Sequence, residues 1–246
     1  MIKLSRKVLL LLLVTLFVLF AFTTLKLAVN GSYRQHDNQI TVSTALQGIS
    51  EDDIKNVQKE ARSALAYIQR ILGISSSKKA NIQIIESGFC YATGETVSLS
   101  VDHVKDSSAP IIHEVTHILA NHGYNSFFSE GLAVYFQDRF GRNYSFPNFS
   151  IPLNEILKSH QNQLISLQHL LNDNNIFEQV GSERRRIAYI QAGSFISFLV
   201  KKYGEQKLAD LHNSRTLDFS KVYGKQLIDL EKEWQKFVFV SPQVKA

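Results

Sequence analysis

The chain has 246 residues, and its 27 lysines and arginines exceed its 22 aspartates and glutamates, which gives a formal charge of +5 at pH 7. Four of these positive charges lie in residues 1–26, so the remainder carries about +1 and lacks the clustered basic face of a nucleic-acid-binding protein. The single cysteine, Cys90, excludes an internal disulfide, so the fold must be stabilised by other means.

Residues 1–26 predict a signal-anchor that crosses the membrane once. Basic residues precede an apolar run at 8–22, which residues 23–25 extend to about eighteen residues, just enough to span a bilayer. The positive-inside rule keeps the N-terminus in the cytoplasm and exports the rest. A cleaved secretory signal, which would give a secreted protein, is the alternative, but residues 21–23 match a cleavage site poorly. We therefore expect a cell-membrane protein whose domain faces outward on a bacterial surface.

A polar stalk is expected at 27–38, followed by a folded domain at 39–246. The first part of this domain should consist of strands and one long helix. Ser50 resembles the start of a capping box, and it opens an amphipathic helix that Gly73 ends. The other elements predicted here are strands at 40–46 and 80–85 and a hairpin at 89–104 that turns near Gly94, with Val97, Leu99 and Val101 pointing inward.

Helices dominate the second half of the predicted domain. They are expected at 164–171, 187–203, 205–212 and 225–238, with an aromatic loop at 142–152 near the cleft. Trp234 should lie in the core, and the basic run 184–186 at a helix start or at the rim of the cleft. The sequence thus predicts an α+β fold, in which a small N-terminal mixed β-sheet with a helix is followed by a mostly helical C-terminal half.

Residues 113–117 read HEVTH, a motif that predicts a metal site. His113 and His117 are four residues apart, so they share one face of a helix and their ring nitrogens can converge on one ion. Glu130, thirteen residues later, can supply a third ligand from a second helix at a similar height. Three protein ligands leave a fourth position open for water, as in a catalytic zinc site, and Glu114 can accept a proton from that water.

Two alternatives to this metal site are disfavoured, the first by apolar neighbours and the second by the matching heights of the two helices. These are a helix with two solvated histidines, and Glu130 as a surface glutamate near a helix N-terminus. The first helix is apolar nearly all round, so it should be buried, and buried imidazoles need partners. Ser107 or Ser108 should cap the start of the first helix, with Pro110 in its first turn, and Gly123 should end it. Asn125 or Ser126 should start the second helix, which runs to Gly141.

The motif and two later blocks, SEGLAVYF at 129–136 and AYIQAGSF at 188–195, resemble the gluzincin metallopeptidases, in particular their compact peptidase MA-like domains. The resemblance covers about residues 40–240. It implies a thermolysin-like catalytic core with the zinc site on two helices between the two halves of the domain. Its zinc would be held by His113, His117 and Glu130, with Glu114 as general base.

The same resemblance implies that Tyr189 stabilises the oxyanion, although relatives carry glycine where this chain has Ala192. A core tyrosine is the alternative for Tyr189. The strand just before the metal-site helices would edge the cleft and pair with an extended substrate. The aminopeptidases' Gly-Ala-Met-Glu-Asn motif is absent from the sequence, which favours an endopeptidase over an exopeptidase that grips a free N-terminus.

These observations predict zinc-dependent hydrolysis of a peptide or protein substrate at the outer face of the membrane. One alternative is a zinc-bearing domain that binds peptide or cell-envelope polymer without cleaving it. Another is an anchored structural or assembly protein in which the motif is accidental. The only other partner expected is the membrane, through the N-terminal segment, and no nucleic acid is expected.

Overall fold

The structure is a computed structural model, and it describes residues 39–74, 78–121, 124–141, 144–214 and 216–240. The predicted anchor at 1–26, the stalk at 27–38 and Gly123 lie outside these residues. Within them, no helix combines the length and the apolar character needed to cross a membrane.

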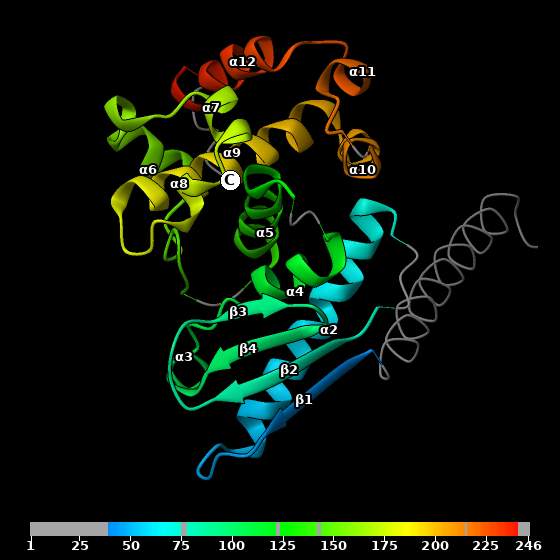
Figure 1. The fold of residues 1–246 in the computed structure, drawn as a ribbon, viewed down its shortest axis with the longest axis vertical. Helices are drawn as coiled ribbons and strands as arrows, with labels where there is room; N and C mark the ends of the chain where they lie inside the picture. Colours follow the sequence, from blue (N-terminus) through cyan, green and yellow to red (C-terminus); the bar gives the residue numbers. More distant parts are fainter. Residues whose placement is uncertain (1–38, 75–77, 122–123, 142–143, 215, 241–246) are drawn as a thin grey trace, which may run out of the picture. The chain divides into compact units, whose positions relative to one another are not determined.

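A four-stranded mixed sheet forms one side of the domain (Figure 1). Its spatial order is β1 (Ile40–Thr44), β2 (Ala80–Ile85), β4 (Thr96–Ser100) and β3 (Tyr91–Thr93). The first three strands run parallel, and β3 runs antiparallel to β4. β3 is therefore the edge strand on the side of the helical half, and the predicted mixed sheet is confirmed.

Helix α2 (Glu51–Leu72) packs along one face of this sheet, and its ends form as the sequence predicts (Figure 1). The capping box is complete, because the Asp53 backbone N–H donates to Ser50 Oγ (3.1 Å) and the Ser50 N–H donates to the Asp53 carboxylate (3.3 Å). Gly73 ends the helix at a φ of +64°, a left-handed conformation that glycine adopts without strain.

The hairpin prediction is correct at its turn and wrong at its end. Gly94 lies between β3 and β4 with a φ of +57°, as expected. However, β4 stops at Ser100, and Val101 begins the short helix α3 (Val101–Lys105) instead of continuing the strand.

The C-terminal half is mostly helical, which confirms the α+β fold (Figure 1). After α4 (Ile111–Ala120) and α5 (Ser126–Phe140) come α6 (Leu153–Ser159), η1 (Gln161–Gln163), α7 (Leu167–Asn172), α8 (Asn175–Glu178), α9 (Glu183–Tyr203), α10 (Glu205–Asn213), α11 (Phe219–Tyr223) and α12 (Leu227–Phe239). Of these, α6, η1, α8 and α11 were not predicted. Trp234 on α12 is fully buried, as expected, and its Nε1–H donates to Ser194 Oγ (2.9 Å).

Helix α5 lies between α4 and α9 and packs very closely against α9 (Figure 1). Small residues permit this approach. A Cβ on Gly193 would lie 2.3 Å from Val134 Cγ1, and a Cβ on Gly131 would lie 3.1 Å from the Ala192 carbonyl oxygen. Because α5 carries Glu130 and α9 carries Tyr189, this contact fixes the position of two predicted site residues.

Gly193→Ala should lower the free energy of unfolding by roughly 1–2 kcal/mol. An alanine in a helix normally gains up to ~1 kcal/mol over glycine, but overpacking of this kind costs ~1–3 kcal/mol. The measurement is urea unfolding followed by circular dichroism. In a Val134→Ala background the clashing methyl group is gone, so Gly193→Ala should cost less there. An increase in stability with Gly193→Ala alone would contradict the tight α5–α9 contact.

Candidate metal centre

Helix α4, which carries the HEVTH motif, begins without the side-chain cap that the sequence predicted. Neither Ser107 nor Ser108 caps it; the N-cap is Pro110, which offers no side-chain hydrogen bond. Instead the backbone N–H of His113 donates to Gln137 Oε1 of α5 (3.1 Å). A tertiary contact thus satisfies an N–H of the first turn and ties the motif to the neighbouring helix.

The short connection between the two helices places the ligands opposite each other. Helix α4 ends at Asn121, in a left-handed conformation with φ +53°, two residues before the predicted Gly123. Helix α5 begins at the cap Asn125, one of the two predicted residues, whose Oδ1 accepts from the Phe128 N–H (2.9 Å). Glu130 then lies just over one turn into α5.

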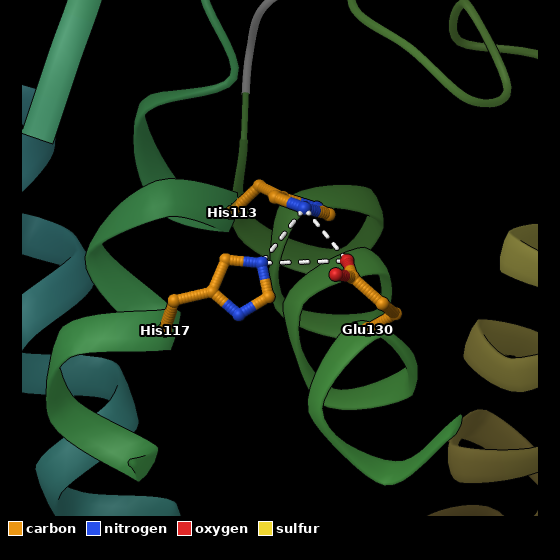
Figure 2. Close-up of side chains that lie close together, drawn as sticks. All are labelled: His113, His117 and Glu130. Carbon is orange, nitrogen blue, oxygen red and sulfur yellow. Dashed lines mark hydrogen bonds and ion pairs between the residues drawn. The ribbon is translucent and has the colours of Figure 1, made fainter. Parts of the chain in front are cut away.

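Three side chains converge across this helix pair (Figure 2). The Nε2 atoms of His113 and His117 are 3.1 Å apart, and Glu130 Oε2 lies 3.2 Å and 3.3 Å from them. Ligands held about 2.0–2.1 Å from a tetrahedral zinc ion lie roughly 3.3–3.4 Å from each other. The three atoms therefore already have nearly the spacing that a zinc ion requires, and two imidazoles with one carboxylate are a donor set that zinc favours.

The charges of the three groups also favour a cation. Burial lowers the pKa of His117, but the Glu130 carboxylate outweighs burial and raises that pKa to about 9. Burial acts in the opposite direction on Glu130, yet the two histidines hold the pKa of its carboxyl well below the usual range. In the absence of metal, a proton on the imidazole pair therefore supplies the positive charge that the carboxylate attracts. A divalent cation can replace that proton.

A cavity of about 1150 Å³ opens in front of the three side chains. This is more than a small-molecule site usually needs and accommodates a peptide segment. The edge strand β3 forms one wall of the cavity. The sequence predicted that the last strand before the metal-site helices would edge the cleft. That strand is β4, which is paired on both sides, so the prediction is wrong and β3 takes this place. Exposed apolar side chains line the cavity, with exposed fractions of 73% for Phe89, 49% for Tyr91, 62% for Tyr144 and 62% for Val180.

Residues 78–240 match the family described as the Peptidase MA superfamily, and this match spans more than half of the chain. The chain belongs to the Peptidase MA superfamily. No curated protein and no solved structure matched it. The matched region begins at β2 and includes the whole site. Peptide hydrolysis is the activity that the superfamily's name describes, and its members typically depend on a metal, so the gluzincin-like resemblance seen in the sequence is confirmed at this level.

Glu114 faces the cavity of this Peptidase MA domain, and only 6% of its surface is exposed. Burial raises the pKa of its carboxyl, and the nearby histidines His113 and His117 oppose that rise. A carboxyl group in this setting can accept a proton at neutral pH when a cation lies beside it. Its role as the base remains a prediction.

Tyr189, on α9, lies against the metal-site residues. Its ring stacks on that of His113, with centroids 6.2 Å apart and planes within 7° of parallel. Burial and then the Glu130 carboxylate raise the pKa of its hydroxyl, so the phenol stays protonated and is a hydrogen-bond donor. The structure thus brings Tyr189 to the site. This geometry is compatible with the oxyanion role, which remains a prediction.

Sequence patterns did not identify Ser129 or Gln137 as residues of the site, and they placed Arg185 only within a basic run at a helix start or cleft rim, where it is found. Ser129 Oγ lies 3.0 Å from His117 Nδ1 and orients that ring, while Gln137 anchors α4 as described above. Arg185 lines the cavity beside Tyr189. Ser129 directly precedes Glu130 and Arg185 lies one helical turn before Tyr189, so the spacing from a predicted residue is the signal that could have indicated their roles. Cys90 also lines the cavity; it is half-buried, and burial raises the pKa of its thiol to about 11.

Proposed function

We propose that this domain is a zinc-dependent endopeptidase. The observation that carries the proposal is the convergence of His113, His117 and Glu130, at 3.1–3.3 Å, on the wall of a peptide-sized cavity. These three residues would hold the zinc ion. When bound, zinc supplies Lewis acidity, which makes water a better nucleophile near neutral pH and polarises a carbonyl.

The chain's own residues then have distinct roles in hydrolysis. Glu114 accepts a proton from the attacking water, whose oxygen bonds to the carbonyl carbon of the scissile peptide. As the C–N bond breaks, Glu114 gives that proton to the leaving nitrogen, which forms a carboxylic acid and an amine; transfer of the second water proton leaves them as a carboxylate and an ammonium group. Tyr189 donates a hydrogen bond to the oxyanion that forms between these two events.

The cavity walls support an extended peptide as the substrate. The free edge of β3 offers backbone N–H and C=O groups to a peptide strand, and such pairing is independent of the peptide's sequence. The exposed Phe89, Tyr91 and Tyr144 offer apolar surface to its side chains. With residues 1–26 as the anchor, hydrolysis would take place at the outer face of the cell membrane.

The experiment is metal removal from the purified protein. We expect about one zinc per chain, cleavage within a library of unblocked and end-blocked peptides, and a loss of at least about a hundredfold in rate after chelation, which added zinc restores. Cleavage of end-blocked peptides separates an endopeptidase from an exopeptidase. Stoichiometric zinc without cleavage would instead favour the second candidate, a zinc-bearing domain that binds peptide or cell-envelope polymer. Absence of zinc would contradict both.

A further inference from the structure

Arg185 is the only lysine or arginine that lines the cavity among the residues that the structure describes. Its guanidinium makes two directed hydrogen bonds. Nε donates to the Phe177 carbonyl oxygen (2.7 Å), and Nη2 donates to the Tyr189 hydroxyl oxygen (3.0 Å). Its Cζ also lies 4.8 Å from the ring centroid of Tyr189 and 5.5 Å from that of Phe146, within cation–π range.

We propose that Arg185 is the positioning residue of Tyr189: anchored on the Phe177 carbonyl, it fixes the phenol so that the hydroxyl proton points into the cavity. This inference rests on the proposed function, because it gives the tyrosine its catalytic orientation. Arg185 belongs to α9 and is not one of the three metal-site side chains.

The hydrogen bond between Arg185 and Tyr189 has a fixed direction. Guanidinium groups only donate, so the Tyr189 oxygen accepts from Arg185. The hydroxyl proton must therefore point away from Arg185, on the side of the Glu130 carboxylate, which acts on this hydroxyl by charge and hydrogen bonding, while the Tyr189 ring lies against His113. Acceptance from a cation also polarises the O–H bond and makes it a stronger donor. A phenol held in this way has its donor on the metal-site side, where an oxyanion would form.

Arg185 is itself held by residues of three segments. Arg185 and Tyr189 are four residues apart on α9, so their side chains meet on one face of the helix. Phe177 and Phe146 belong to other segments, α8 and the loop after α5, and they enclose the guanidinium from outside the helix. The side chain is therefore fixed at both ends. Lysine carries its donors on one nitrogen and has no planar group, so it cannot reproduce both the spacing of the two bonds and the stacking on the rings.

Three single variants, and the double variant that combines Arg185→Gln with Tyr189→Phe, test this inference in the zinc-loaded full chain. Arg185→Gln should lower kcat roughly ten- to a hundredfold with KM within about twofold, and Tyr189→Phe should lower it at least as much. The double variant should be no slower than Tyr189→Phe alone, because the arginine acts through the phenol. Arg185→Lys should remain defective. Additive losses in the double variant, or full activity with lysine, would overturn the proposal.

Arg186→Gln is the matched control for Arg185→Gln, because it also removes a positive charge and a hydrogen bond to a backbone carbonyl of another segment. Its Nε donates to the Pro147 carbonyl oxygen (3.0 Å) and its Nη1 to Glu183 (2.9 Å), yet it does not line the cavity. Arg186→Gln should therefore leave kcat within about twofold of the wild type. If Arg186→Gln is as slow as Arg185→Gln, the effect belongs to general stabilisation of the helix start, and the proposal fails.

A second measurement needs no turnover. A phosphinic pseudopeptide with benzyl side chains on both sides of phosphorus carries an anionic oxygen where the oxyanion forms, and calorimetry gives its affinity for each variant. We expect Arg185→Gln and Tyr189→Phe each to weaken binding about tenfold or more, and the double variant to bind like Tyr189→Phe. Wild-type protein that binds this probe but cleaves no peptide would contradict the proposed function and leave this test valid. Wild-type protein that cleaves peptides but gives equal affinities for all variants would contradict the role of Arg185.

Discussion

Glu114→Gln should abolish most hydrolysis while the metal stays bound. Glutamine preserves the size of the side chain but cannot accept the proton of the attacking water, and loss of such a base typically costs about a hundredfold to ten-thousandfold in rate. Glu114 is not one of the three converging side chains in Figure 2, so its amide should leave the metal content unchanged. The measurement pairs kcat/KM on a cleaved peptide with zinc content after dialysis.

Glu95→Gln is the matched control for this variant. The same chemical change then occurs at an exposed residue in the turn between β3 and β4, where neither rate nor zinc content should change by more than about twofold. Loss of zinc with Glu114→Gln would mean that this carboxylate is a ligand and that the role of Glu130 is wrong. Retention of the full rate would remove Glu114 from the chemistry.

The elements that the sequence predicts best are those whose signals are local. The Ser50 capping box, the left-handed Gly73 and the Gly94 turn need only neighbouring residues, and all three occur as expected. The HEVTH spacing is equally local, because four residues in a helix determine that two side chains share a face. Placement of Glu130 required one further inference, a tight connection between two helices, and Asn125 supplies its start.

The missed elements are short and mostly lack side-chain caps. Helices α6, η1 and α8 have seven, three and four residues, and none of their N-caps, Pro152, His160 and Asn174, makes a side-chain capping hydrogen bond. Segments of this length hold too few residues to show a helical periodicity. Helix α7, which was predicted, has the local cap Ser166, but Glu231 Oε1 also accepts from its Leu167 N–H (3.1 Å), a contact from far along the chain that no local pattern indicates.

The start of α4 shows the same limit within the site. Ser107 and Ser108 are good capping residues by type, but Gln137 of α5 fulfils this function for His113 from another helix. The sequence therefore predicts which residues can bind a metal, whereas the contacts that hold them rigid appear only in three dimensions. Arg185 belongs to the second group, since its bonds to Phe177 and Tyr189 identify it better than its position in a basic run does.

His117→Ala should remove zinc from the protein, and His113→Ala should do the same. Either change leaves two of three ligands, and since loss of an outer-shell partner alone costs about 10–100-fold in affinity, loss of a ligand should cost at least about a hundredfold. Zinc content after dialysis and calorimetric titration with zinc measure the effect. His103→Ala is the matched control, because His103 lines the same cavity without joining the cluster, and its zinc content should not change.

The pH dependence of zinc binding gives this prediction its sharpest form. The Glu130 carboxylate raises the pKa of His117 to about 9, so at neutral pH the metal must displace a proton. The apparent affinity of the wild type should therefore increase as the pH rises toward about 9 and fall as the pH drops. His117→Ala has no such proton to displace and should show a weaker dependence on pH. Unchanged zinc content in both histidine variants would disprove the ligand assignment, and with it the proposed chemistry of this cavity.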